Sequence, residues 1–224
     1  ADESARLRQI SQQFIAGKHF EGVGGLTVTD AMRVEIAAQA CLLVLELGLE
    51  WYRDWVEVIV YPSQFVPRRE IEDEFGVVHV VEEPLAGEAW LGGPVLLSWE
   101  DVEAASESLC FNIIIHEFAH KLDMLNGDPN GQPPLHPGMD AAEWNRALHG
   151  AYQDFVRRVE ASPDPDTDES FIIDPYAAEH PSEFFAVITE AFFDVPDVLA
   201  NEYPAVYAQL VKFYRQDPFA RHTR

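Results

Sequence analysis

The sequence predicts an α+β fold, in which a small mixed sheet is combined with several helices. Three short runs over residues 56–61, 75–81 and 94–97 are rich in β-branched residues and have the composition of buried strands. Longer segments around these runs place apolar residues at helical spacing. The chain has 224 residues, of which 47% are hydrophobic, and this length suits one core. We therefore expect residues 1–224 to form one domain, with residues 1–25 as a peripheral N-terminal helix.

The N-terminal half is predicted to contain two helices before its first strand. Residues 1–16 place apolar side chains at helical spacing, and a second, apolar helix runs from Thr27, where a sequence similar to a capping box begins, to Gly48. The strand over 56–61 should end at Pro62, because proline cannot donate a backbone hydrogen bond.

The C-terminal half is predicted to be mainly helical. Residues 127–134 contain three prolines and two glycines and are expected to form a loop between helices. Residues 162–169 are expected to form an acidic loop, which lacks the glycine and spacing of a calcium-binding EF-hand. Pro181 is a favourable first residue for a helix. From the spacing of apolar residues, we expect helices over 99–107, 108–125, 140–161, 181–194 and from 204 onward.

The composition argues against several classes of partner. The formal net charge is −24, from 39 acidic and 15 basic residues, and such a field repels phosphate backbones and anionic lipids. The chain has no run of about 18 apolar residues, and its N-terminus lacks a signal-peptide pattern. Cys41 and Cys110 lie among apolar residues, which suits reduced thiols. We therefore expect a cytoplasmic protein that binds neither nucleic acid nor membranes, and we predict a monomer with a solubilising acidic surface.

Residues His116-Glu117-Phe118-Ala119-His120 match the H-E-x-x-H pattern of zinc hydrolases. On a helix, two histidines four residues apart lie on one face, and both can bind one Zn²⁺ at about 2.0–2.1 Å. The carboxylate of Glu117 then projects beside the metal, where it can accept a proton from a zinc-bound water whose pKa is lowered to about 7. The pattern predicts one catalytic zinc ion per chain.

An ordinary amphipathic helix is the alternative explanation of this pattern. The residues that precede the motif weaken this alternative, because Phe111, Ile113, Ile114 and Ile115 are apolar and a helix that is apolar on all sides is buried. Buried histidine and glutamate side chains are costly without partners. The surroundings of the motif therefore favour a metal site.

The third zinc ligand must come from outside the motif, because catalytic zinc generally has three protein ligands. In metzincins a glycine after the motif precedes a third histidine ligand, but Asp123-Met124 stands at that place here. A histidine ligand of this type is therefore excluded, and a downstream glutamate is the alternative. Glu179 precedes the expected helix at 181–194, and Glu190 lies two turns beyond Glu183, roughly 10 Å away. Glu183 lies on the first turn of a helix that apolar residues bury, which suits a rigidly held ligand. We expect Glu183 to bind the metal, and Glu190 either to hydrogen-bond to a ligand or to pair elsewhere in the cleft.

Two further residues have candidate roles beside the metal. Asp123 falls seven residues after His116 on the same helical face, where it can accept a hydrogen bond from a metal-bound imidazole. Packing at the C-terminal end of the helix is the alternative for Asp123. Tyr176 lies on the short approach to the Glu183 helix, so its hydroxyl can reach a substrate carbonyl. The alternative for Tyr176 is a packed aromatic ring.

Residues 116–124, 176–178 and 182–187 resemble the Mlc titration factor A family of bacterial zinc peptidases, which is related in its catalytic core to the protease domain of anthrax lethal factor. The resemblance extends to residues 93–99 and 213–218, and it covers most of the chain from about residue 50 onward. It implies a zincin-like domain of the gluzincin type, in which glutamate is the third ligand, and a peptidase activity described as aminopeptidase-like.

The same resemblance assigns roles to individual residues. It maps His116, His120 and Glu183 onto the zinc ligands of the family and Glu117 onto its general base. Tyr176 matches a tyrosine near the metal that can stabilise the oxyanion. The family name also implies binding to Mlc, a glucose-responsive transcriptional repressor.

Two functions of different classes follow from these observations. The first is a zinc-dependent peptidase, which hydrolyses peptide bonds through a metal-activated water and binds the substrate backbone along a strand near residues 90–97. The second is a regulatory protein that binds and sequesters a transcriptional repressor, with peptidase activity incidental.

Overall fold

The computed structural model describes residues 3–66, 69–72, 78–81, 84–105, 111–168 and 170–222. Its mixed helix-and-sheet architecture confirms the predicted α+β class. The α-helices are α1 (Glu3–Gly17), α2 (Asp30–Leu43), α3 (Trp99–Ala105), α4 (Ile113–Asp123), α5 (Ala141–Ala161), α6 (Pro181–Asp194), α7 (Pro196–Glu202), α8 (Pro204–Tyr214) and α9 (Pro218–His222). The 3-10 helices are η1 (Leu49–Tyr52), η2 (Met124–Asn126), η3 (Pro165–Thr167) and η4 (Pro175–Ala178).

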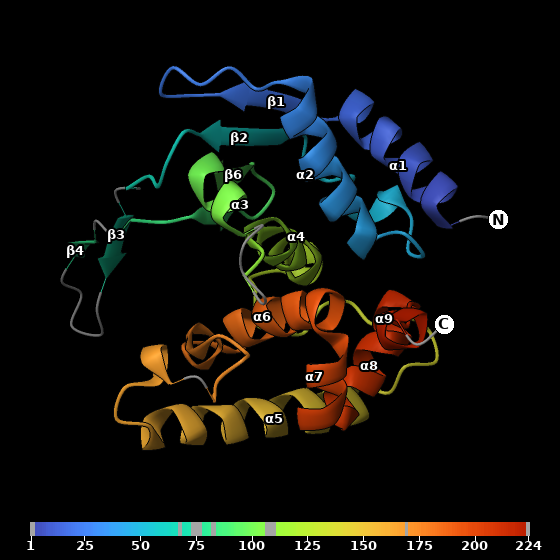
Figure 1. Cartoon of the computed structure of the whole chain (residues 1–224), viewed down its shortest axis with the longest axis vertical. Coiled ribbons are helices and arrows are strands. Elements are labelled where there is room, and N and C mark those ends of the chain that lie inside the picture. The colour runs from blue at the N-terminus through green and yellow to red at the C-terminus, as the bar shows by residue number, and fades with distance from the viewer. Residues whose placement is uncertain are drawn as a thin grey trace.

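A four-stranded mixed sheet has the strand order β1 (His19–Gly22), β2 (Glu57–Tyr61), β6 (Val95–Ser98) and β5 (Gly87–Ala89). The first three strands are parallel, with Val58 opposite Val95 across the β2–β6 pair. Strand β5 runs antiparallel to β6 and lies at the end of the sheet. Strands β3 (Arg69–Glu72) and β4 (Val78–Val81) form a separate antiparallel pair, seen on the left of Figure 1.

The elements with strong sequence patterns are confirmed. The predicted strands at 56–61 and 94–97 correspond to β2 and β6, and the C-terminal helices correspond to α5, α6 and α8. Part of the strand predicted at 75–81 is β4, whereas residues 75–77 lie outside the described residues. The same holds for Cys110 and for the end of the helix predicted at 99–107.

Several predicted boundaries were wrong. The second helix begins at Asp30 rather than Thr27, because the side chain of Thr29 accepts a hydrogen bond from the backbone N–H of Met32 and so caps the helix. It ends at Leu43, well before Gly48. Helix α4 begins at Ile113, after Asn112 as N-cap, rather than at 108.

The strand proposed for substrate binding also needs correction. The Trp90–Pro94 stretch forms the turn between β5 and β6, and β6 pairs with strands on both sides. Within the described residues, β5 pairs only with β6, so β5 is the strand whose second edge is available beside α4. A run of Gly-Glu-Ala has no strand-forming residue, which explains why its sequence did not predict a strand.

Helix α4 lies at the centre of the molecule, between the sheet with α1 and α2 on one side and the layer of α5 to α8 on the other (Figure 1). Every residue of α4 is buried. The Phe118 ring packs against Phe14, Tyr52 and Trp55, with ring centroids 5.4–5.7 Å apart. Residues from α1, η1 and the loop that follows it therefore enclose one face of α4.

The opposite face of α4 packs against α6. Helix α6 is buried along most of its length, and its apolar side chains pack on α5 and α8 through Trp144, Phe184, Phe185 and Phe213. This packing holds α6 as a rigid element next to α4. In the part of the chain that the structure describes, none of the helices combines the length and apolar composition needed to span a bilayer.

Candidate metal centre

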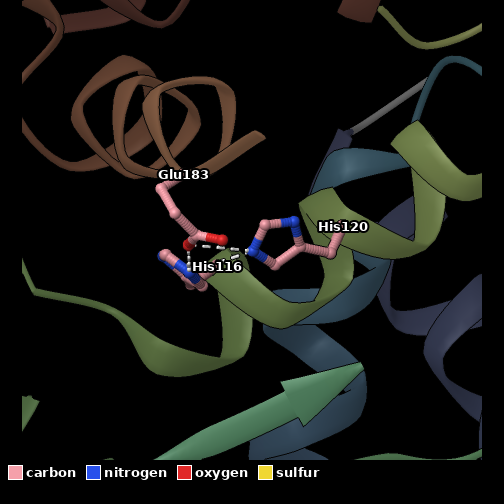
Figure 2. Close-up of side chains that lie close together, drawn as sticks. All are labelled: His116, His120 and Glu183. Atoms are coloured by element: carbon pink, nitrogen blue, oxygen red, sulfur yellow. Dashed lines mark hydrogen bonds and ion pairs between the residues drawn. The ribbon is translucent and has the colours of Figure 1, made fainter. Parts of the chain in front are cut away.

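Helices α4 and α6 bring three potential metal ligands together. His116 and His120 extend from one face of α4, and Glu183 reaches them from the first turn of α6 (Figure 2). The direction of Glu183 is set by the start of α6, where Pro181 is the first helical residue and His180 Nδ1 accepts a hydrogen bond from the Ser182 N–H. The local signals that begin a helix therefore also position a carboxylate.

The three ligand atoms form a nearly equilateral triangle. Glu183 Oε2 lies 3.1 Å from His116 Nε2 and 3.2 Å from His120 Nε2, and the two Nε2 atoms are 3.2 Å apart. Three ligands that each lie about 2.0–2.1 Å from one tetrahedral ion are separated by about 3.3–3.4 Å. The triangle is therefore close to the size that a zinc ion requires, and its two nitrogens and one oxygen are donors that zinc accepts. These residues fit a metal ion.

A second carboxylate supports His116 from behind. Glu190 Oε1 lies 2.7 Å from His116 Nδ1, and Glu190 Oε2 accepts a hydrogen bond of 2.5 Å from the backbone N–H of Asn112. Glu190 is only 2% exposed. Its two contacts fix the orientation of the His116 ring and leave Nε2 directed at the cluster. Glu179, by contrast, is exposed at the end of η4 and lies outside the ligand group.

The cluster attracts positive charge. Burial alone would lower the pKa of His116, but hydrogen bonds to Glu183 and Glu190 outweigh burial and raise that pKa well above its ordinary value. Burial alone would raise the pKa of Glu183, but hydrogen bonds from His116 and His120 outweigh it and hold that pKa far below the usual range. A divalent cation between these side chains would supply the positive charge that a protonated His116 imidazole provides in the metal-free cluster.

Glu117 has a different environment from Glu183. It is 4% exposed, and burial raises its pKa to about 7 against the opposing effect of His116 and His120. Strand β5 approaches this carboxylate closely at Gly87, where an added Cβ atom would lie 2.5 Å from Glu117 Oε1. Only glycine leaves the Glu117 side chain this space. The sequence analysis missed Gly87, because nothing in an isolated glycine indicates which side chain occupies the space beside it.

Asp123 makes its hydrogen bonds to a loop rather than to an imidazole. Its Oδ2 accepts two bonds of 2.7 Å from the backbone N–H groups of Asn130 and Gly131. The other oxygen, Oδ1, and the Nδ1 atom of His120 are both buried without a hydrogen-bond partner in the described part of the chain. The hydrogen bond expected between Asp123 and a metal-bound imidazole is therefore not among the hydrogen bonds that this structure shows.

Lys121 ties the β5–β6 turn to α4. Its buried Nζ donates to the carbonyl oxygens of Trp90, at 2.7 Å, and Gly93, at 2.9 Å. It also lies 5.0 Å from the centroid of the Trp55 ring. Burial lowers the pKa of Lys121 to about 8. The contact anchors β5 beside Glu117, and sequence analysis also missed it.

Two cavities meet at the candidate metal centre. The first has a volume of about 270 Å³ and is lined by His116, His120 and Glu183 together with Gly87 and Tyr176. The Tyr176 ring centroid lies 6.1 Å from that of His116, and 45% of Tyr176 is exposed. Tyr176 therefore lies at the open wall of the cavity rather than inside the core.

Comparison with known proteins agrees with this geometry. Residues 1–215 match a family described as glucose-regulated metallo-peptidase M90. The chain is 39% identical over 221 residues to a protein of Salmonella arizonae named Mlc titration factor A. The match covers 99% of this chain and 86% of that protein. Proteins with the same name from Salmonella gallinarum and Salmonella typhimurium are 39% and 38% identical over 221 residues, each covering 99% of this chain and 82% of the relative.

The three glutamates near the cluster should differ in their effect on metal affinity. Glu183→Ala removes an atom of the triangle, so we expect the zinc affinity to fall by more than about 100-fold. Glu190→Ala removes the support of His116 and should lower it by about 10–100-fold. The measurement is a competition titration of the metal-free protein against a chromogenic chelator. Glu179→Ala is the control and should leave the affinity unchanged; a larger loss for Glu179→Ala than for Glu183→Ala would contradict the assignment.

Proposed function

Because the chain belongs to the glucose-regulated metallo-peptidase M90 family, we propose that it is a zinc-dependent peptidase with aminopeptidase-like activity. The observation that carries this proposal is the triangle of His116, His120 and Glu183 atoms, with sides of 3.1–3.2 Å. Such a group suits one zinc ion per chain, and the first cavity beside it has room for a water molecule or a substrate carbonyl. The fold proposed is a single zincin-like domain of the gluzincin type over residues 1–224.

The metal would be held by the two imidazole Nε2 atoms and by Glu183 Oε2. When bound, zinc supplies Lewis acidity, which polarises a peptide carbonyl and makes water more acidic. Glu190 orients the His116 ring through its 2.7 Å contact with Nδ1. These side chains come from two helices that are buried against each other, and this rigidity favours a well-defined geometry.

Glu117 is the proposed general base. Its carboxylate adjoins the metal ligands and lines the first cavity, and its pKa of about 7 lies where proton transfer at neutral pH is efficient. It would take a proton from the attacking water and deliver it to the amine that leaves. The Tyr176 hydroxyl, at the wall of the same cavity, would donate a hydrogen bond to the oxyanion that forms at the scissile carbonyl.

Strand β5 is the proposed docking edge for the substrate backbone. It lines the first cavity with Gly87, Glu88 and Ala89, next to Glu117. An extended peptide that adds to a sheet edge gains backbone hydrogen bonds that do not depend on its sequence. The anchoring of the β5–β6 turn by Lys121 supports this role, because a docking edge must be fixed relative to the catalytic groups.

Binding of a transcriptional repressor is the second proposed function. It is favoured by one observation, the name Mlc titration factor A of relatives that are 38–39% identical over 99% of this chain. That name implies that those proteins bind the Mlc repressor. Peptidase activity and repressor binding can belong to one molecule, so the two functions have to be separated by a variant that loses only one.

A cytoplasmic location and a monomeric state complete the proposal. The Cys41 thiol is fully buried, and burial raises its pKa to about 12, as suits a thiol that stays reduced and unreactive. Size-exclusion chromatography with light scattering of the purified chain would test the monomeric state.

Glu117→Gln should retain zinc and lose hydrolysis. The amide cannot accept the proton, so we expect kcat/KM on chromogenic aminoacyl and peptide substrates to fall by about 10²–10⁴-fold, with an unchanged metal content. Glu179→Gln is the matched control, since Glu179 is exposed and lies outside the ligand group. Turnover near the wild-type value would exclude Glu117 as the base.

The Glu117→Gln variant also separates the two functions, because a repressor-binding protein with incidental peptidase activity should bind Mlc equally well with and without this substitution.

Tyr176→Phe should lower kcat by about 10²–10³-fold with little change in KM, because the lost hydrogen bond forms only in the transition state. Zinc content, measured by elemental analysis, should not change. An unaltered kcat would show that Tyr176 only packs at the cavity wall.

Gly87→Ala should impair catalysis without unfolding the protein. The new methyl group would lie under 3 Å from three atoms of the Glu117 side chain, which can rotate away and lose its catalytic position. We expect kcat to fall by about 10²-fold and the circular dichroism spectrum to be unchanged. Gly150→Ala is the control, because an added Cβ atom there has no neighbour within 4 Å. Full activity of Gly87→Ala would contradict the close approach between β5 and the base.

A further inference from the structure

A second cavity of about 300 Å³ adjoins the candidate metal centre. It shares Leu85, Gly87, His116, Glu117 and Tyr176 with the first cavity, but it extends toward the start of α4 rather than toward His120. A peptide docked at the metal centre can therefore place one side chain in each cavity, on the two sides of the bond to be cleaved.

The walls of the second cavity combine apolar surface with carboxylates. The apolar part is formed by Leu85, Phe111, Ile113 and Val187, among others. Four acidic residues line the same cavity, namely Asp101, Glu117, Asp174 and Glu190. Among the described lining residues there is no lysine or arginine to neutralise them. His116 pairs with one of these carboxylates, that of Glu190, so the cavity is apolar along its sides and carries more acidic than basic groups.

Asp101 is the acid best placed to bind a ligand. Glu190 already uses both carboxylate oxygens, and Asp174 accepts the Tyr176 N–H at 2.8 Å to cap η4. Asp101 Oδ1 accepts a 3.1 Å hydrogen bond from Gln64, whereas its Oδ2 is buried without a hydrogen-bond partner in the described part of the chain. A buried carboxylate oxygen without a donor is costly, and a cationic ligand would supply the donor.

We propose that the second cavity binds a lysine or arginine side chain of the peptide substrate, and this proposal rests on the peptidase function proposed above. The methylene groups of such a side chain would lie along Leu85, Phe111 and Val187, while its cationic end pairs with Asp101. The formal net charge of −24 further favours the approach of basic peptides.

The direction of β5 indicates which substrate residue enters this cavity. Residues 84–87 line the second cavity, whereas the first is lined by Gly87–Ala89 and, of residues 84–86, only by Leu85. A peptide that pairs antiparallel with β5, the commoner arrangement, runs from the first cavity toward the second. The second cavity therefore receives the residue that directly follows the cleaved bond.

The test compares peptides that differ only in one charge. In the series Ala-Xaa-Ala-Ala-Ala, Xaa is arginine or citrulline, its neutral analogue of nearly the same shape. The free α-amino group is common to both peptides, and removal of the first residue places Xaa directly after the cleaved bond. Mass spectrometry locates the cut. We expect cleavage directly before arginine, with a kcat/KM about tenfold higher than for the citrulline peptide. A charge-assisted hydrogen bond between the guanidinium and Asp101 accounts for a difference of about this size.

Two variants on one helix show whether Asp101 is responsible. Asp101→Asn should reduce the arginine-to-citrulline ratio to near one, mainly by lowering kcat/KM for the arginine peptide. Glu100→Gln changes the net charge equally, and Glu100 is exposed and does not line the cavity, so it should retain the preference. Equal rates for the two peptides, a preference on the other side of the cut, or equal effects of the two variants would overturn the proposal.

Binding to the Glu117→Gln variant provides a readout that does not need catalysis. Fluorescence anisotropy with labelled forms of the two peptides should show about tenfold tighter binding of the arginine peptide, and Asp101→Asn in the same background should remove the difference. If the wild-type protein cleaves no peptide at all, the proposed peptidase function is wrong, but the difference in binding still tests the proposed role of the second cavity. Equal binding of the two peptides would overturn the proposal for the cavity.

Discussion

A helix that is buried on every side must find an internal partner for each polar side chain that it carries. Helix α4 carries five such residues within the eight residues 116–123, and each of them contacts a part of the protein outside α4. His116 and His120 meet α6, Lys121 holds the β5–β6 turn, and Asp123 holds the loop after η2. Glu117 lies against β5. The sheet, the helical layer and one loop are therefore all positioned relative to α4, and the candidate centre forms where their contacts converge.

Glu183 and Glu117 adjoin the same two imidazoles but have opposite electrostatic environments. Burial affects both, but Glu183 receives hydrogen bonds from two histidines and its pKa falls, whereas burial dominates for Glu117 and its pKa rises to about 7. The first is suited to remain an anionic ligand, and the second to exchange a proton near neutral pH. Backbone geometry separates the two roles, because Glu183 enters from α6 and Glu117 is enclosed by β5.

Residues whose role depends on periodicity could be predicted from the sequence. The four-residue spacing of His116 and His120 and the apolar stripes of the long helices appear in the structure as expected. Glu183 could be favoured over its neighbours because α6 is strongly apolar. By contrast, β5 has no strand-forming residues and exists because β6 and Lys121 hold it in place. The role of Gly87 could not be predicted either. Gly87 matters because it has no side chain where β5 approaches Glu117, and the sequence does not show that these two residues are close.

The ligand that α6 supplies follows His120 by 63 residues. During synthesis at roughly 5–20 residues per second, the two histidines leave the ribosome about 3–13 seconds before that glutamate. Even then, α6 must pack against α4 before the triangle exists, since nothing local brings the two helices together. A metal ion that needs all three ligands therefore binds a chain that has already folded. Maturation of the centre then depends on the free metal concentration that the finished protein encounters.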